Sequence, residues 1–245
     1  MRSIFFFFLS LGLNILKLKN IIHIPRFIID IIRFKNSGGK IDFISPILGD
    51  NVQQVVDKHY FLQDLYVAQQ IFKNNPKNHL DIGSRIDGFV THLASFRKVN
   101  VLDLRPINIE HENIRFINED LLKFETKEIF DSISCLHTIE HVGLGRYGDE
   151  INPNSYKQFY KKIIKILNQK GRLYISFPIS KENKVYFNSQ RTFDPKHILQ
   201  LDESLRLIEF SLINDDYKMI NNIDINKSYN HIDNNSCGIY IFEKN

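Results

Sequence analysis

The sequence contains few of the residues that build disulfide-stabilised or metal-binding proteins. It has two cysteines among 245 residues, Cys135 and Cys237, and both lie in apolar runs typical of strands. Buried reduced thiols are therefore favoured over a disulfide or a metal site. No cysteines and histidines stand at the spacing of metal ligands, so we expect no bound metal.

A strong charge of either sign is also missing. The chain carries 32 basic and 28 acidic residues, which gives a formal net charge of +4 with histidine neutral. No basic run is interleaved with aromatic residues, and no nucleic-acid-binding motif is present. This balance does not favour nucleic acid as a partner. It is compatible with an anionic substrate or a membrane surface.

The N-terminal region is apolar but lacks two signals. Residues 4–16 resemble the core of a signal peptide, but no Ala-x-Ala-like cleavage site follows. The run is also shorter than the ~20 residues that a membrane-spanning helix needs. A second segment, residues 25–35, places Phe27, Ile28 and Ile31 near one another on a helix, with basic residues around them. That pattern suits either a cap helix packed on the domain or a helix on a membrane surface.

A flexible break at Asn36-Ser37-Gly38-Gly39 separates these helices from a connecting region, residues 40–56, which ends in a helix. We therefore divide the chain into an N-terminal helical extension or cap, residues 1–56, and a larger domain, residues 57–245. We expect a cytoplasmic protein. Peripheral contact with the inner membrane face through residues 1–35 is the alternative.

The larger domain alternates strand-like runs with helical periodicity. A helix over residues 57–75 has Phe61, Leu65, Ala68 and Phe72 at helical spacing and stops at Pro76. Another helix follows Asn152-Pro153 and carries an apolar stripe made of Tyr156, Phe159, Tyr160, Ile163, Ile164 and Leu167. A short helix follows Asp194-Pro195. Strands are predicted over residues 78–82, 99–104, 114–118, 130–136, 172–177, 205–213 and 238–243. Alternation up to the fifth strand predicts an α/β, doubly wound, mostly parallel seven-stranded sheet with an antiparallel terminal strand pair.

The loop after the first strand indicates a ligand site. Gly83 and Gly88 bracket a tight turn from the strand into a helix over residues 89–96, whose N-terminus presents free N–H groups. Arg85 stands where a second glycine would admit a pyrophosphate, which disfavours a nicotinamide dinucleotide. S-adenosylmethionine has an adenosine but no phosphate, and its ammonium and carboxylate groups suit Asp81 and Arg85.

Polar side chains close the first four strands, where ligands bind in sheets of this class. Asp103 lies about twenty residues past the glycine loop, the distance at which an acid meets ribose hydroxyls. Asp120 is placed to accept from the adenine amine, and His137 belongs to the cofactor wall. The predicted cofactor-binding residues are Asp81, Gly83, Ser84, Arg85, Gly88, Asp103, Leu104, Asp120, Leu121 and His137.

The loop after the fourth strand concentrates residues suited to chemistry. His141 is a candidate general base that would remove the proton of a substrate hydroxyl, because a histidine titrates near neutral pH. The alternative is that His141 packs or caps a helix. Arg146, Tyr147 and Arg191 are predicted to bind the substrate, the arginines through a phosphate or carboxylate, although each arginine alone also suits a surface position. Gly143, Gly145 and Gly148 predict a pliable loop.

The order of these motifs resembles the class I S-adenosylmethionine-dependent methyltransferase superfamily. Residues 81–89, 103–106, 140–149 and 187–191 more closely resemble a bacterial family of unknown function, often encoded among surface-polysaccharide genes. The resemblance runs from about residue 45 to the C-terminus. It implies S-adenosylmethionine as cofactor, Glu140 and His141 as the catalytic pair, and O-methylation of a sugar in surface-glycan biosynthesis.

Two other functions stay open at the level of sequence. The loop that contains Arg85 departs from the usual glycine pattern, which suits a non-catalytic binding or scaffold protein of the same fold. A nucleotide-dependent oxidoreductase is disfavoured by the missing glycines and by the antiparallel terminal strand pair.

Overall fold

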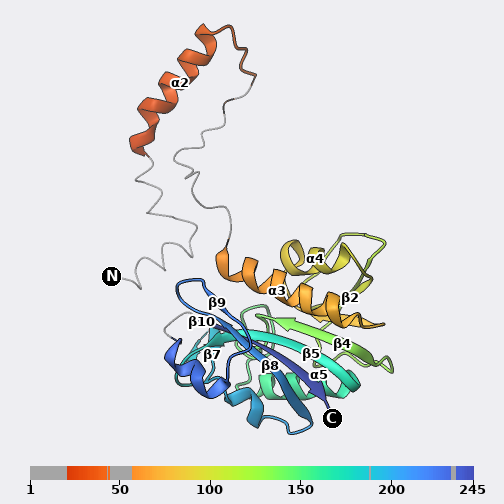
Figure 1. Cartoon of the computed structure of the whole chain (residues 1–245). Helices are drawn as coiled ribbons and strands as arrows, with labels where there is room; N and C mark the ends of the chain where they lie inside the picture. The colour runs from red at the N-terminus through yellow and green to blue at the C-terminus, as the bar shows by residue number, and fades with distance from the viewer. Residues whose placement is uncertain (1–20, 43, 45–56, 188, 233–235) are drawn as a thin grey trace. The chain divides into compact units, whose positions relative to one another are not determined.

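The computed structural model describes residues 21–42, 44, 57–187, 189–232 and 236–245 (Figure 1). The chain divides into two compact units, Met1–Val56 and Asp57–Asn245. The apolar run at residues 4–16 and the predicted helix at the end of the connecting region lie outside the described residues.

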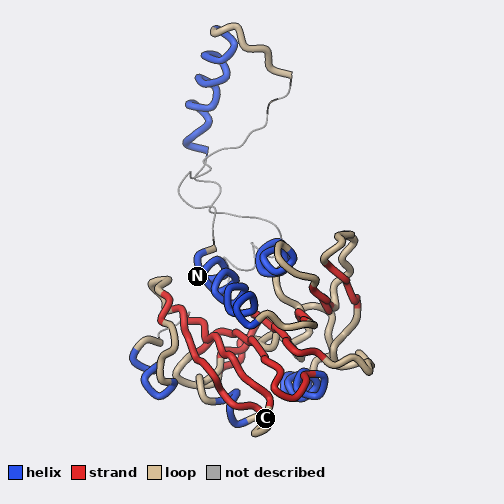
Figure 2. The backbone as a smooth tube through the Cα atoms, turned by 45° about the vertical axis from the view of Figure 1, so that its right-hand side comes forward, coloured by secondary structure: helices blue, strands red, loops and turns tan. Residues whose placement is uncertain are grey.

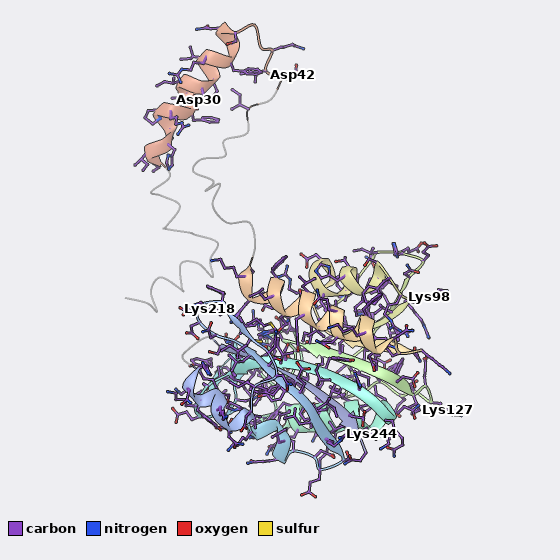
Figure 3. All side chains as sticks on the ribbon, viewed as in Figure 1. Asp30, Asp42, Lys98, Lys127, Lys218 and Lys244 are labelled. Carbon is purple, nitrogen blue, oxygen red and sulfur yellow. The ribbon has the colours of Figure 1, made fainter. Side chains whose placement is uncertain are left out.

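The described part of the first unit is dominated by one amphipathic helix, α2 (Ile24–Asn36), which has Pro25 in its first turn. None of its residues is buried, and the exposed apolar side chains include Ile24, Ile28 and Ile32. At about 3.6 residues per turn Asp30 (labelled in Figure 3) falls on the opposite side of the helix, and it lies within 4 Å of Arg26 and Arg33. Among the residues described, no helix combines the length and apolarity needed to cross a bilayer.

The apolar side of α2 leads to a prediction about lipid binding. Replacing Ile28 and Ile32 with serine removes two large apolar groups from one side of the helix, each contributing about 1.5–3 kcal/mol when fully buried. We expect at least a tenfold loss of co-sedimentation with liposomes that contain anionic phosphatidylglycerol. Asp30→Ser on the opposite side serves as the control and should bind at least as well as the unmodified chain, because it removes a negative charge. Equal binding by all three proteins would rule out this surface.

The second unit is built on one mixed sheet (Figure 2). Its strand order is β3-β2-β1-β4-β5-β10-β8-β9. The first five strands in this order, from β3 to β5, pair in parallel with their neighbours. Strand β10 pairs antiparallel with both β5 and β8. The bounds are β1 (His79–Ile82), β2 (Val99–Asp103), β3 (Ile114–Asn118), β4 (Phe130–Leu136), β5 (Leu167–Ile179), β8 (Leu205–Ile213), β9 (Met219–Ile220) and β10 (Ser236–Lys244).

The predicted fold class is therefore confirmed. All seven predicted strands are present, the first five form the parallel part, and the last two form an antiparallel pair. Strand β9, two residues long, adds an eighth member at the edge. A separate hairpin of β6 (Lys184–Tyr186) and β7 (Gln190–Thr192), which the sequence did not predict, lies beside the end of β5.

Helices cover both faces of the sheet (Figures 1 and 2). On one face α3 (Lys58–Asn74), the π-helical turn η2 (Ile86–Val90) and α4 (Thr91–Ala94) share a core with alternate residues of β2. On the other face α5 (Ser155–Ile166) buries its predicted apolar stripe against the sheet. Lys244 (Figure 3) donates from Nζ to the carbonyl oxygens of Ile164 and Leu167 at the end of α5, both at 2.7 Å. Two 3₁₀ helices, η3 (His197–Gln200) and η4 (Ile225–Asn230), complete the domain.

Two connections differ from the expected strand–helix alternation. Residues 104–113 and 119–129 are described throughout, and they form loops and turns without a helix. Both connections are shorter than the dozen or more residues that a crossover with a helix usually needs. The parallel pairing of β1, β2 and β3 holds nevertheless.

The buried face of α3 also differs from the predicted stripe. Phe61, Leu65 and Phe72 are exposed by 49%, 40% and 63%, and only Ala68 of the predicted set is buried. The helix instead buries Val67 and Ile71 together with the polar residues Gln63 and Asp64. Polar side chains are tolerated there because they are hydrogen-bonded, and Ser176 Oγ donates to Gln63 Oε1 at 2.7 Å.

Candidate functional site

A cavity of about 520 Å³ opens at the carboxyl ends of the parallel strands. The loops after β1, β2, β3 and β4 all contribute to its lining, as the sequence predicts for a sheet of this class. Of the predicted site residues, the structure brings together Gly83, Arg85, Asp103, Leu104, Asp120, Leu121, His137, His141, Arg146 and Tyr147. Asp81, Ser84, Gly88, Glu140 and Arg191 are not among the lining residues.

Asp81 lies beneath the glycine loop and is fully buried. Its Oδ1 accepts hydrogen bonds from Ser84 Oγ at 2.7 Å and Ser134 Oγ at 2.6 Å, and its Oδ2 accepts from the Ser84 amide at 3.2 Å. Ser84 Oγ in turn accepts from the Leu136 amide at 3.1 Å. The two predicted cofactor contacts Asp81 and Ser84 thus tie the end of β1 to β4 rather than facing the cavity.

The buried network extends to His79. Because Ser134 Oγ donates to Asp81, it must accept from His79 Nε2 at 3.0 Å, and His79 Nδ1 then accepts from Ser132 Oγ at 2.8 Å. Burial lowers the pKa of His79 to about 3, so this ring is neutral. Burial raises the pKa of Asp81 to about 7, against the opposing effect of its serine donors.

Both glycines of the loop lie close to side chains of neighbouring elements. Gly83 has a φ of +68°, and a Cβ there would stand 2.7 Å from Thr138 Cγ2. A Cβ at Gly88 would stand 2.6 Å from Asp64 Oδ2 on α3. Gly88 therefore allows α3 to approach the turn η2, whereas the sequence suggested that it makes room for a ligand.

Asp103, at the end of β2, forms an ion pair with Arg105. Asp103 Oδ1 accepts from Arg105 Nε at 2.9 Å, and Oδ2 accepts from Arg105 Nη2 at 2.6 Å. This pairing raises the pKa of Arg105 above its ordinary value. Asp120 lies across the cavity at the end of β3, where its Oδ1 accepts from the Leu122 amide at 3.0 Å.

His137 adopts a left-handed backbone conformation, with φ at +51°, directly after β4. Its Nδ1 lies 2.9 Å from Glu140 Oε1, and its Nε2 lies 3.3 Å from Cys237 Sγ. Burial alone lowers the pKa of His137, but Cys237 and Glu140 outweigh burial and raise the pKa well above its ordinary value. Glu140 is fully buried, so this predicted catalytic residue lies behind the cavity and holds His137 in place.

His141 lines the cavity in a defined tautomer. Its Nδ1 lies 2.6 Å from the carbonyl oxygen of Ser189, and a carbonyl can only accept. Nδ1 therefore carries the proton, and Nε2, 3.8 Å from Glu140 Oε1, holds the lone pair. Burial lowers the pKa of His141, although Glu140 acts in the opposite direction. The ring is thus neutral at neutral pH.

The loop that follows is held more firmly than its glycines suggest. The carboxylate of Asp149 accepts from the amides of Gly143 at 2.7 Å, Gly145 at 3.3 Å and Tyr147 at 3.2 Å. Gly143 has a φ of +80°, and a Cβ there would stand 2.1 Å from the carbonyl oxygen of Asn152. The glycines allow tight turns around one carboxylate, which presents Arg146 and Tyr147 at the cavity.

Arg191 supports this loop from behind. Its side chain is buried, and Nη1 donates to the carbonyl oxygen of Val142 at 2.6 Å. The guanidinium lies 4.9 Å from the ring centre of Tyr156 on α5. A role in positioning the loop replaces the direct substrate contact that the sequence suggested.

Several lining residues were not predicted from the sequence. Tyr60 reaches the cavity from α3, with its ring 5.0 Å from both the Arg85 guanidinium and the His137 ring. No local pattern marks Tyr60, because α3 precedes the first strand. Arg105 could have been found, since it follows Asp103 by two residues. Thr138 and Gln190 also line the cavity.

The chain superimposes on the N-methyltransferase NodS from Bradyrhizobium japonicum WM9 in complex with S-adenosyl-L-homocysteine, with a TM-score of 0.54 and 15% identity over 80% of this chain and 93% of that one. The corresponding values are 0.53, 15%, 82% and 97% for the Burkholderia thailandensis 1,6-didemethyltoxoflavin-N1-methyltransferase with bound S-adenosylhomocysteine. For coclaurine N-methyltransferase bound to N-methylheliamine and S-adenosylhomocysteine they are 0.52, 13%, 80% and 76%.

The chain therefore has the class I S-adenosylmethionine-dependent methyltransferase fold. In sequence, residues 113–202 match a family described as Caenorhabditis protein of unknown function, DUF268. That segment covers less than half of the chain. No curated protein matches the chain.

The Asp81 network leads to a prediction about pH and stability. The pKa of Asp81 is higher in the folded chain than in the unfolded chain, so its favourable contribution is complete below about pH 4 and is lost as the pH rises through about 7. Asp81→Asn removes this titration, while the opposite trend of His79 is common to both proteins. We expect the free energy of unfolding of the unmodified chain, minus that of the variant, to fall between pH 4.5 and 7.5. Each unit of pKa shift corresponds to about 1.4 kcal/mol. Urea denaturation measures this difference, and a constant value would contradict it.

Proposed function

We propose that this chain is an S-adenosylmethionine-dependent methyltransferase that methylates a hydroxyl group, on a sugar used in surface-glycan biosynthesis. The observation that carries the proposal is a strand-end cavity with acids on one side and a neutral histidine of fixed tautomer on the other. Its volume of about 520 Å³ lies in the usual range for small-molecule sites.

The lining of the cavity fits an adenosyl cofactor. Asp103 would accept from the ribose hydroxyls, Asp120 from the adenine amine, and Leu104 and Leu121 would contact the adenine ring. Arg85, beside Tyr60, would pair with the methionine carboxylate. When bound, this cofactor supplies a methyl group already activated by a positively charged sulfur. The chain then has to orient an acceptor in line, and correct orientation alone contributes up to about 7–11 kcal/mol.

His141 serves as the general base in this proposal. Its Nε2 accepts the proton of the acceptor hydroxyl, and the buried carboxylate of Glu140, 3.8 Å away, stabilises the resulting imidazolium. The carbonyl of Ser189 keeps the other nitrogen protonated throughout. Tyr147 and Arg146 lie beside His141 and contact the acceptor, and Arg191 supports their loop.

The sugar acceptor is supported by the resemblance to a family encoded among surface-polysaccharide genes and by the exposed ring of Tyr147 at the cavity. We place the enzyme in the cytoplasm, with α2 resting on the inner membrane face. A non-catalytic binding protein is the second candidate, because Arg105 already pairs with the carboxylate assigned to the ribose.

The cofactor assignment predicts a selective thermal shift. S-adenosylmethionine or S-adenosylhomocysteine at a hundred times its Kd should stabilise the full chain by about 2.7 kcal/mol. NADH should give no shift, because Arg85 takes the place of the glycine that lets a pyrophosphate approach the backbone. A shift with NADH alone would favour an oxidoreductase, and no shift with either adenosyl compound would overturn the methyltransferase proposal.

The base assignment predicts a loss of turnover without a loss of cofactor binding. His141→Ala should lower kcat by about 10²–10⁴-fold, the usual contribution of a general base. Its Kd for S-adenosylhomocysteine should stay within about twofold. Turnover is measured as transfer of a radiolabelled methyl group to a panel of sugar acceptors, and His231→Ala, an exposed histidine outside the cavity, is the matched control.

The pH profile gives a second measurement of the same assignment. Because burial lowers the pKa of His141, the rate of the unmodified chain should already be near its plateau at pH 7. Unchanged turnover in His141→Ala would remove His141 as the base. Cofactor binding without transfer to any acceptor would favour the non-catalytic candidate.

A further inference from the structure

Asp103, whose carboxylate is assigned to the ribose, is already hydrogen-bonded to Arg105. Asp103 Oδ1 accepts from the Arg105 amide at 2.8 Å and from Arg105 Nε at 2.9 Å, while Oδ2 accepts from Arg105 Nη2 at 2.6 Å. The side chain of Asp103 is only 5% exposed, whereas that of Arg105 is 50% exposed. The guanidinium therefore lies between a buried acid and the cavity.

The capacity of this carboxylate limits what else it can hold. Each carboxylate oxygen accepts about two hydrogen bonds, so Oδ1 is full and Oδ2 has one position left. A ribose diol presents two hydroxyl donors. Both can reach the carboxylate only if the side chain of Arg105 withdraws from Oδ1, and the backbone amide contact can remain. Cofactor binding and the Arg105 side chain therefore compete for Asp103.

A second arginine lies near the place where the released guanidinium would move. The Cζ atom of Arg105 is 5.8 Å from the ring centre of Tyr147, and the Cζ of Arg146 is 5.2 Å from the same ring. All three residues line the cavity. Arg146 donates to the carbonyl oxygen of Ser189 at 3.1 Å, and no carboxylate of the described residues lies within 4 Å of its guanidinium.

Asp149, an acid of the same loop as Arg146, is otherwise engaged. The carboxylate of Asp149 accepts three backbone amides of its own loop and is turned into that loop. Once Arg105 leaves Asp103, two guanidinium groups flank one exposed aromatic ring. That is an arrangement for an oxyanion, because a guanidinium offers paired donors that match phosphate or carboxylate oxygens.

We propose that Arg105 is a specificity-determining residue with two successive partners. While the cofactor is absent, Arg105 pairs with Asp103. Once the ribose has displaced the Arg105 side chain from Asp103, Arg105 and Arg146 together bind an oxyanion of the methyl acceptor. The acceptor class is thereby narrowed to molecules that carry a phosphate or a carboxylate near the methylated hydroxyl. The inference rests on the proposed function, since it takes the ribose diol as the ligand of Asp103. It also makes acceptor binding depend on prior cofactor binding.

The first experiment uses calorimetry of the full chain with S-adenosylhomocysteine. Arg105→Gln removes the competing guanidinium, and we expect its Kd to be about two- to fivefold lower than that of the unmodified chain, as for loss of a partly exposed ion pair. Arg206→Gln, which breaks the exposed pair with Glu243 outside the cavity, is the matched control and should leave the Kd unchanged. A higher Kd in Arg105→Gln would overturn the proposal, because Arg105 would then be a direct cofactor ligand.

The second experiment uses small oxyanions as probes of the acceptor site. Inorganic pyrophosphate and malonate are titrated with and without saturating S-adenosylhomocysteine. We expect at least one of them to bind at least threefold more tightly when S-adenosylhomocysteine is present, and this gain should disappear in both Arg105→Gln and Arg146→Gln. A gain for pyrophosphate assigns a phosphate-bearing acceptor, and a gain for malonate assigns a carboxylate. No gain for either probe, or a gain that survives in both variants, would overturn the inference.

Failure of the two proposals gives different results. If S-adenosylhomocysteine does not bind the unmodified chain, the proposed function fails and this inference fails with it. If it binds but neither the affinity change in Arg105→Gln nor the oxyanion gain is found, the methyltransferase assignment stands and only the role of Arg105 is lost. Melting temperatures of the variants, expected within a few degrees of the unmodified chain, verify that each protein is folded.

Discussion

The site depends on a carboxylate that does not enter it. Asp81 joins the glycine loop to β4 through Ser84 and Ser134, so the loop after β1 and the end of β4 share one buried acid. Burying a carboxylate is costly unless its oxygens are hydrogen-bonded, and three donors converge on this one. Ser134 also forms a hydrogen bond with His79, which extends the polar network across β1 and β4. The spacing between Gly83 and His137 is thereby set beneath the cavity floor.

A second buried acid organises the opposite wall. Glu140 has one oxygen 2.9 Å from His137 and 3.8 Å from His141, so the two histidines share a carboxylate but differ in its effect. Glu140 and Cys237 raise the pKa of His137, whereas burial dominates at His141 and lowers its pKa. Two histidines four residues apart in the sequence thus have pKa values shifted in opposite directions, raised at His137 and lowered at His141. Such separation of pKa values is how one environment assigns two roles.

The fold was predictable because it is encoded in local periodicity. Strands at residues 114–118, 130–136 and 205–213 have the predicted bounds, and α5 buries the predicted stripe. Helix α3 was misjudged because periodicity gives a spacing but not the side that faces the sheet. The side of α3 that faces the sheet includes buried polar residues such as Gln63, whose hydrogen-bond partner Ser176 lies far along the chain.

The site was predictable to the level of strand ends. Asp103, Asp120 and His141 line the cavity because the topology brings those loops together. The sequence could not show that Asp81 or Arg191 turns away from the cavity, since the direction of a side chain depends on partners distant in sequence. Tyr60 was out of reach for the same reason.

The contact between His141 and the carbonyl of Ser189 joins the loop after β4 to the tip of the β6–β7 hairpin. The hairpin carries Val185, Tyr186 and Phe187, three consecutive exposed apolar side chains. The carbonyl of Ser189 is the group that keeps the proton of His141 on Nδ1 and leaves Nε2 as the basic nitrogen. The identity of the basic nitrogen is therefore set by a small surface element outside the main sheet. Any molecule that displaces the hairpin would change the acid–base chemistry of the cavity without entering it.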